Sequence, residues 1–405
     1  MVALTVLDAL FMGSLVGAAM AAPAVERWAP AAAPVKMMLQ KHVLTDGAKP
    51  RNRARLSKGV KAGGKAARAN SEGLNDYYLG TDLQWYGGFQ AGTPAQNFTV
   101  VFDTGSFSAE IPSTKCTSCG SQKKFNSAAS STYHSYGTTS TENFGTGVGV
   151  DPSDYESYTL AQVRDTLAIA GLSAAATDFN LITSETSGFL NDPFDGIVGM
   201  GYRGSGTIFQ NLVSNGLPAV FSLALLPEGT SGSEITLGGI DTTKYTTPLT
   251  YIPVSGSSFW ELKNTQMAVN GKTSSTLKVS NNIIFDSGTS NIVFPSSVTK
   301  ALYALISPNI KPVGTLGAYG IACSEIGSIT ATLDFTFTSS SGQPFNLTIP
   351  PEELNVGPFA SDPTMCQTLI NAQSGYYILG GSVLKHYYSV WDQANARMGF
   401  SKTSS

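Results

Sequence analysis

Two six-residue stretches of this 405-residue chain nearly repeat each other: VFDTGS at residues 101–106 and IFDSGT at residues 284–289. Each places an aspartate directly after an apolar run, followed by a hydroxyl residue and a glycine. A carboxylate at the end of a buried strand is costly unless it has partners, and glycine permits a tight turn with close backbone approach. One such tripeptide predicts an ordinary turn, whereas two matched copies indicate a shared role for Asp103 and Asp286.

A second landmark follows each turn at a similar distance. Ile197-Val198-Gly199 ends 96 residues after Asp103, and Ile378-Leu379-Gly380 ends 94 residues after Asp286. Two halves of similar length therefore carry the same landmarks in the same order, which is the pattern of an internal repeat. We expect a duplicated β lobe, with a pseudo-two-fold axis that brings equivalent points together.

The composition predicts an all-β protein with a large core. Charged residues make up 13% of the chain, against about 25% in an average globular protein, and hydrophobic residues make up 42%, which excludes global disorder. Short β-branched and aromatic runs alternate with turn-forming clusters, as expected for mainly antiparallel strands. The clearest runs are Asn97–Phe102, Glu234–Leu237, Ile252–Val254, Ile283–Phe285 and Leu333–Thr338. Helices are expected only at Thr207–Asn215 and at Ser296–Ile306, the second capped by Ser296 or Ser297.

The formal net charge of −3 argues against nucleic acid as a partner, but it hides an asymmetry. Residues 22–72 hold eleven Lys and Arg against three acidic residues, a net charge of +8, while residues 73–405 carry −10. The two parts attract each other at neutral pH. The attraction weakens as carboxylates take up protons, which suits a protein that works in acid.

The beginning of the chain indicates secretion. An apolar run at residues 10–21 ends in Ala-Met-Ala, which predicts a signal peptide over residues 1–21, with a buried N-terminal helix as the alternative. Residues 22–72 are rich in Ala, Lys and Arg and are interpreted as a basic prosegment, with a disordered tail as the alternative. The two β lobes are expected at 73–248 and 249–405. Apart from the apolar run at residues 10–21, no stretch approaches the ~20 apolar residues of a membrane span, so no membrane partner is expected.

Four cysteines fit two disulfides in an oxidising compartment. Three pairings exist, and we predict the two local ones, Cys116–Cys119 and Cys323–Cys366. The alternative for the first pair is half of a zinc site or a redox motif. Zinc is disfavoured because there is no second CxxC motif and the chain has only three His. Asn97 and Asn346 open the two tripeptides with the form of N-glycosylation acceptors.

If symmetry brings Asp103 and Asp286 together, their carboxyls cannot both ionise easily and share one proton. Such a pair can hold a water molecule between its oxygens. The ionised oxygen would accept a proton from the water, and the protonated partner would donate one to a carbonyl oxygen. This chemistry would hydrolyse an amide with neither a metal nor a cofactor.

From about Tyr77 to Ser401 the chain resembles the pepsin-like aspartic proteases, and in texture their secreted fungal members. The motifs that carry the resemblance are Gly92-Thr93-Pro94 with Gln96, the two Asp turns, FDGIVGMG at 194–201, Phe259-Trp260, and Ile378-Leu379-Gly380-Gly381 through Tyr388. The resemblance implies a bilobal fold with pseudo-two-fold related lobes and a central cleft. It also agrees with a basic prosegment and two local disulfides.

The resemblance assigns roles residue by residue. It makes Asp103 and Asp286 the catalytic pair. It implies that Thr104 and Ser287 brace the two loops, that Ser106 and Thr289 bond the outer carboxylate oxygens, and that Gly105 and Gly288 complete the turns. The flap over the substrate would contain Phe144, Gly145 and Thr146.

Three departures from the family pattern stand out. Phe144 replaces the usual flap tyrosine, Glu110 replaces the usual tryptophan after the first Asp, and Gly381 stands where many members have aspartate. In the family the tyrosine and tryptophan hydrogen-bond each other, so losing both is self-consistent. These departures motivate an alternative function, that of a catalytically weak or inactive pepsin-like binding or inhibitor protein.

The leading expectation is a secreted acid endopeptidase made as a zymogen, with the vacuole as the alternative location. The family implies polypeptide substrates with large apolar residues on both sides of the scissile bond. The chain's own prosegment would act as an intramolecular inhibitor, and a monomer is expected because the repeat already supplies both halves.

Overall fold

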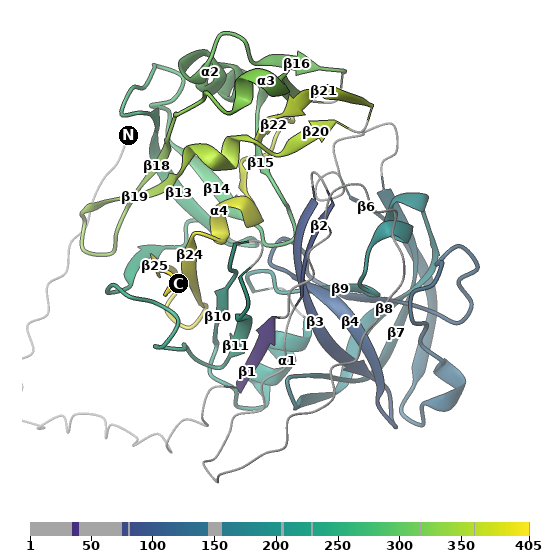
Figure 1. The fold of residues 1–405 in the computed structure, drawn as a ribbon. Coiled ribbons are helices and arrows are strands. Elements are labelled where there is room, and N and C mark those ends of the chain that lie inside the picture. Colours follow the sequence, from purple (N-terminus) through teal and green to yellow (C-terminus); the bar gives the residue numbers. More distant parts are fainter. Residues whose placement is uncertain are drawn as a thin grey trace, which may run out of the picture. The chain divides into compact units, whose positions relative to one another are not determined.

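The structure is a computed structural model that describes residues 35–39, 75–79, 82–144, 156–203, 206–227, 230–315, 317–359 and 361–404. All of these residues belong to one compact unit. The predicted signal peptide and most of the predicted prosegment lie outside the described residues. The described strands form four mainly antiparallel sheets, as the composition predicts (Figure 1).

The first half of the sequence forms an eight-stranded sheet. Its strands, in spatial order, are β2 (Asn75–Leu79), β3 (Asp82–Ala91), β4 (Gln96–Asp103), β9 (Gly196–Gly199), β5 (Ala109–Pro112), β8 (Leu172–Glu185), β7 (Glu156–Ile169) and β6 (His134–Phe144). Strand β3 also pairs with β7, so strands at opposite sides of the order meet.

The second half forms a seven-stranded and a four-stranded sheet. The seven-stranded sheet contains, in order, β19 (Pro344–Ile349), β18 (Leu333–Thr338), β13 (Glu261–Val269), β14 (Asn281–Phe285), β23 (Ile378–Leu379), β15 (Ile292–Phe294) and β22 (Ile370–Ala372). The four-stranded sheet contains β16 (Lys311–Val313), β17 (Ala318–Ala322), β21 (Asp362–Gln367) and β20 (Gly357–Phe359).

A six-stranded sheet draws its strands from both halves. Its order is β1 (Val35–Leu39), β11 (Ser233–Leu237), β10 (Val220–Ala224), β24 (Tyr387–Asp392), β25 (Arg397–Lys402) and β12 (Thr250–Pro253). The ladder between β10 and β24 joins the two halves directly, and β1, from within residues 22–72, occupies one edge (Figure 1).

The repeated sequence landmarks become equivalent strand arrangements. In the first half, β9 lies between β4 and β5, parallel to β4 and antiparallel to β5. In the second half, β23 lies between β14 and β15 in the same way. Both Ile/Val/Leu-rich landmarks therefore form the inner strand beside the strand that leads to an aspartate, which explains why they are continuously apolar.

The core between the two halves is aromatic. Trp260 is fully buried, and its ring packs against those of Tyr202, Phe221 and Trp391. Its Nε1 donates a hydrogen bond to the carbonyl of Met200 at 2.9 Å. Because buried indole N–H groups need a partner, this bond fixes the tryptophan of the second half against the first.

Helices are short in the described part of the chain. They are α1 (Ile208–Ser214), α2 (Ser296–Ile306), α3 (Cys323–Ile326) and α4 (Gly381–Leu384), with single 3₁₀ turns at Ser127–Ala129, Ser187–Asn191 and Pro351–Leu354. The predicted helices correspond to α1 and α2. The predicted serine cap of α2 is wrong, because Pro295 occupies the N-cap and makes no side-chain capping bond.

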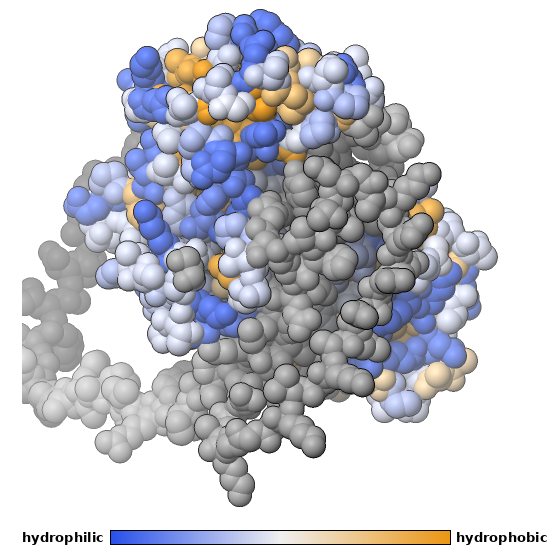
Figure 2. Space-filling view, viewed as in Figure 1, coloured by the Kyte–Doolittle hydropathy of each residue, from blue (hydrophilic) through white to orange (hydrophobic). Residues whose placement is uncertain are grey.

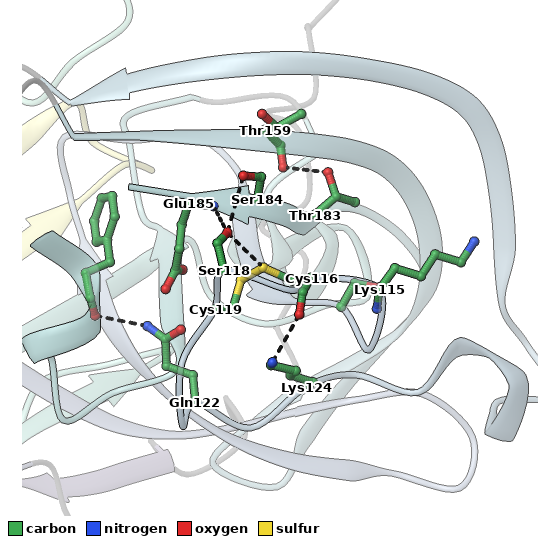
Figure 3. Close-up of a disulfide and its surroundings, with 12 residues drawn as sticks. Lys115, Cys116, Ser118, Cys119, Gln122, Lys124, Thr159, Thr183, Ser184 and Glu185 are labelled. Carbon is green, nitrogen blue, oxygen red and sulfur yellow. Dashed lines mark hydrogen bonds between the residues drawn. A yellow bond between two sulfur atoms is a disulfide. The ribbon is translucent and has the colours of Figure 1, made fainter. Parts of the chain in front are cut away.

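Both predicted disulfides are present, Cys116–Cys119 and Cys323–Cys366. Figure 3 shows that Ser118, between the first two cysteines, ties their loop to the end of β8: its Oγ accepts a hydrogen bond from the Glu185 N–H at 2.9 Å and lies 3.3 Å from Ser184 Oγ. Lys124 Nζ donates to the Cys116 carbonyl at 3.0 Å. The loop is therefore held on two sides as well as closed covalently.

On the face drawn in Figure 2, hydrophilic residues cover much of the described surface, and hydrophobic ones gather mainly near α2 and α3. The two acceptor asparagines, Asn97 on β4 and Asn346 on β19, are both exposed. No helix within the described ranges is long and apolar enough to cross a membrane.

The packing of Gly196 gives a stability prediction. A Cβ at this residue would lie far inside van der Waals contact with the Glu110 carbonyl oxygen of β5, so Gly196→Ala must push β9 and β5 apart. We expect the free energy of unfolding, measured by urea denaturation, to fall by about 3 kcal/mol, because overpacking typically costs 1–3 kcal/mol or more. The matched control is Gly327→Ala, whose Cβ would meet open space; equal losses in both variants would contradict this account.

Candidate active site

Asp103 and Asp286 lie at the ends of equivalent strands. Asp103 is the last residue of β4 and is paired with Gly199 in β9. Asp286 follows β14, and its N–H donates to the Leu379 carbonyl of β23 at 3.0 Å. Each aspartate therefore leaves the sheet where the inner apolar strand of its own half ends.

The hydroxyl residues after the two aspartates join the loops reciprocally. The N–H of Ser287 donates to Thr104 Oγ1 at 2.9 Å, and the N–H of Thr104 donates to Ser287 Oγ at 3.1 Å. Each hydroxyl then donates to the strand of the opposite half: Thr104 Oγ1 to the Phe285 carbonyl at 3.0 Å and Ser287 Oγ to the Phe102 carbonyl at 2.6 Å. Four buried hydrogen bonds thus lock the loops in a symmetric register.

The glycines of the two turns make room for the opposite carboxyl. A Cβ on Gly105 would clash with the carboxyl of Asp286, and a Cβ on Gly288 would clash with the carboxyl of Asp103. The N–H groups of these glycines donate at 2.8 Å to Oδ1 of their own aspartates. Glycine is therefore required by the close approach of the two carboxyls, independently of any turn conformation.

The two carboxyls are in direct electrostatic contact. Burial raises the pKa of Asp103 well above its ordinary value, and the negative charge of Asp286 and a side-chain hydrogen bond between the two residues raise it further. The Ser106 hydroxyl and the Gly105 N–H oppose the rise. A pair in this arrangement retains a proton where isolated carboxyls would lose it.

The hydroxyl groups beside the two carboxyls make different hydrogen bonds. Thr289 Oγ1 donates to Asp286 Oδ2 at 2.6 Å. Within the described residues, Ser106 Oγ makes no hydrogen bond of ordinary geometry, although its hydroxyl is near enough to lower the pKa of Asp103. The hydrogen bonds of Thr104 and Ser287 are therefore symmetric, whereas those of Ser106 and Thr289 are not.

The predicted flap lies largely outside the described part of the chain. Gly145 and Thr146 are not described, and of Phe144 only its backbone at the end of β6 is. Glu110 is described and is buried in β5, while Gly381 begins α4, where its N–H donates to the Thr289 carbonyl. Gly381 therefore supports the Asp286 loop through its backbone.

Two contacts at this site are not predictable from sequence motifs. Gln84 Nε2 of β3 donates to the Gly288 carbonyl at 2.8 Å, across 204 residues. The rings of Phe107 and Phe259 also meet, with centroids 5.0 Å apart. The signal for Gln84 is weak, because β3 also contains the polar residues Asp82 and Gln90, whereas Phe259 belongs to the Phe259-Trp260 motif.

Among the residues that the structure describes, no group of three or more His, Cys, Asp or Glu could hold a metal ion. The chemically distinctive cluster is the Asp pair with its hydroxyl, glycine and backbone donors. It brings two carboxyls and fixed hydrogen-bond donors together in one place.

The fold and the paired Asp turns define a pepsin-like aspartic protease, the class of aspartic endopeptidases. The family model described as eukaryotic aspartyl protease matches residues 84–403, and the chain belongs to this family. It is 33% identical over 331 residues to embryonic pepsinogen of Gallus gallus, an alignment that covers 79% of this chain and 81% of the relative.

Two further relatives match over similar lengths. An aspartic protease of Phaffia rhodozyma is 33% identical over 338 residues, covering 80% of this chain and 77% of the relative. Cathepsin D of Dictyostelium discoideum is 32% identical over 335 residues, covering 79% and 83%. The family resemblance given by the motifs is therefore confirmed.

The reciprocal brace predicts the effect of Thr104→Val. Valine keeps the shape of threonine but leaves the buried Ser287 N–H and Phe285 carbonyl without this partner. We expect the free energy of unfolding to fall by about 2–3 kcal/mol, the cost of unsatisfied buried polar groups. Ser287→Ala should cost a similar amount, and the double variant should cost clearly less than the sum. Additive losses in this urea-denaturation cycle would show that the two hydroxyls act independently.

Proposed function

We propose that this chain is a secreted acid endopeptidase, made as a zymogen, that hydrolyses peptide bonds between apolar residues of polypeptide substrates. Asp103 and Asp286 are its catalytic pair. The observation that carries the proposal is the mutual approach of the two carboxyls, each facing the glycine of the opposite turn. The raised pKa of Asp103, caused by burial and then by Asp286, supports a shared proton in weak acid.

In the proposed reaction, a water molecule lies between the carboxyls and the substrate carbonyl. The ionised carboxylate takes a proton from the water as its oxygen attacks the carbonyl carbon. The protonated carboxyl donates its proton to the carbonyl oxygen, giving a tetrahedral diol. The pair then passes its proton to the amide nitrogen and accepts one from a diol hydroxyl as the C–N bond breaks, which releases a carboxylic acid and an amine and leaves the pair with one proton.

The zymogen proposal is supported by strand β1. It lies within the predicted prosegment, residues 22–72, and pairs antiparallel with β11 through five residue pairs. A segment that fills the edge of a sheet protects unpaired backbone groups. The +8 charge of residues 22–72 and the −10 charge of residues 73–405 add an attraction that acid weakens.

Asparagine at one member of the pair tests the reaction. We expect Asp103→Asn to lower kcat on a denatured protein at pH 3–4 by at least about 100-fold, the usual minimum contribution of general acid–base catalysis. Asp362→Asn, the same change on a carboxylate bonded only locally by Thr364, should keep wild-type rates.

A statine-type transition-state mimic should bind the wild type more tightly than a substrate peptide does. A wild type that binds peptides but cleaves none would favour the binding-protein alternative.

Acid treatment of the proform, residues 22–405, tests the zymogen proposal. Incubation at about pH 3 to 4, where carboxylates begin to protonate, should remove the basic segment and give a new N-terminus near residues 68–76, seen by mass spectrometry. The Asp103→Asn proform should stay intact under the same conditions. Persistence of the wild-type proform at full length, while it cleaves an added peptide, would show that no inhibitory prosegment is present.

A further inference from the structure

Gln84 is a buried amide that connects the two halves of the chain. It lies near the start of β3, in the sheet of the first half, and is 6% exposed. Its Nε2 donates a hydrogen bond of 2.8 Å to the Gly288 carbonyl, in the Asp286 turn of the second half. Because the acceptor is a carbonyl oxygen, only the NH₂ side of the amide can face it. The bond therefore joins β3 to the turn that carries the other half's aspartate.

The Gly288 carbonyl belongs to the peptide unit between Gly288 and Thr289, and each of these two residues supplies a donor to Asp286. The Gly288 N–H donates to Asp286 Oδ1 at 2.8 Å, and Thr289 Oγ1 donates to Asp286 Oδ2 at 2.6 Å. The position of this single peptide unit therefore affects hydrogen bonds to both oxygens of the carboxyl.

The turn itself holds this peptide unit weakly. Its own closing bond, from the Thr289 N–H to the Asp286 carbonyl, is 3.4 Å long, beyond the usual range of about 2.7–3.2 Å for such bonds. Residue 288 must be glycine, because a Cβ there would clash with the Asp103 carboxyl, and glycine leaves the backbone more freedom than any other residue. A bond from outside the turn, such as that of Gln84, is what fixes the peptide plane.

We propose that Gln84 is a positioning residue for the catalytic pair: its amide fixes the peptide unit between Gly288 and Thr289 and thereby holds both hydrogen-bond donors on Asp286. The inference rests on the proposed function, because it concerns the pair that would hydrolyse the peptide bond. It gives β3, which carries neither aspartate, a part in stabilising the ionised form of the pair.

The two donors determine the effect expected in strong acid. The pair works with one proton, so activity is lost when the remaining carboxylate is protonated as well. Hydrogen bonds to an ionised carboxyl favour that form and lower its pKa. The charged groups that meet here are Asp103 and Asp286 themselves, whereas Gln84, Gly288 and Thr289 carry no charge. If the peptide unit loosens, the first ionisation of the pair therefore moves to higher pH.

The test measures kcat and KM on a peptide with large apolar residues at the scissile bond. The range is about pH 1 to 6, which includes both ionisations of a paired aspartate site. Gln84→Met keeps a side chain of similar length but removes the donor. Gln90→Met is the matched control, because Gln90 lies in the same strand and donates to Asn97 within the first half. Near-UV circular dichroism at each pH confirms that folded protein is measured.

We expect the acid limb of kcat/KM, which reports the free enzyme, to move up by about half a pH unit in Gln84→Met. At the acid end of the profile this is a loss of about threefold relative to the variant's own maximum. Maximal kcat should fall by about tenfold, because small misplacements of reacting groups are costly, while KM changes by less than about twofold. Gln90→Met should follow the wild type in kcat, KM and the limb.

Two further variants distinguish positioning from packing. Gln84→Asn keeps the amide but is one carbon too short to reach Gly288, so it should show the same shift of the limb as Gln84→Met. In a Thr289→Val background one of the two donors on Asp286 is already absent. Adding Gln84→Met there should move the limb by clearly less than it does in the wild type, whereas a packing defect would add in full.

The outcomes separate this inference from the proposed function. If the wild type cleaves in acid and Asp103→Asn does not, but Gln84→Met keeps the wild-type acid limb, the positioning role is wrong and the catalytic pair stands. A rise in KM alone would make Gln84 a substrate contact, and a uniform loss of kcat with an unmoved limb would assign it to packing; either result overturns the inference. If Asp103→Asn cleaves as well as the wild type, the proposed function itself fails.

Discussion

Two acidic side chains that must share one proton can be held together only by a scaffold that resists their repulsion. Here that resistance comes from the reciprocal hydrogen bonds between the uncharged residues Thr104 and Ser287. Because each hydroxyl also bonds to the strand of the other half, separating the carboxyls would break four buried bonds at once. The close approach of Gly105 and Gly288 to the opposite carboxyls is possible only while this register holds.

The same constraint explains why the halves are not independent domains. The β10–β24 ladder makes one continuous sheet from strands of both halves, and the fully buried Trp260 bonds to Met200 of the other half. A hinge between the halves would move the loops relative to each other, and a misplacement of even 1 Å in a reacting group can cost about 100-fold in rate. Placing the loops over a shared sheet and an aromatic core removes that freedom.

Much of this arrangement could be predicted from the sequence because both halves carry the same motifs in the same order. The paired DTG and DSG turns, the inner apolar strands, helices α1 and α2 and both disulfides rest on local signals. Contacts that depend on one side chain meeting a distant backbone carry no such signal: Gln84 reaches Gly288, and Pro295, not a serine, caps α2. Likewise, VKMML at Val35–Leu39 lies within a basic segment, and its place as an edge strand is decided by β11, almost 200 residues away. Glu110 departs from the family pattern in the sequence alone, but its burial follows only from the strands around it.

Two buried glutamates in this chain have different charged neighbours, and their pKa values move in opposite directions. Glu110 has another acid as its charged neighbour, and its pKa is raised. Glu353 is also largely buried, which favours its neutral form, but His386 and Lys385 outweigh burial and hold its pKa below the ordinary value. Lys385 Nζ lies 2.8 Å from Glu353 Oε2, directly after α4, the helix whose first N–H supports the Asp286 loop.

Since the pKa of Glu353 is lowered, its contribution to stability is present above the ordinary value and is lost only as the pH falls through the lower, folded value. The ion pair of Lys385 and Glu353, directly after α4, is therefore retained until the pH falls below the ordinary pKa of glutamate. The two halves have equivalent strand arrangements around their aspartates, but the pKa of Glu110, beside the Asp103 loop, is raised, whereas the pKa of Glu353, beside the Asp286 loop, is lowered.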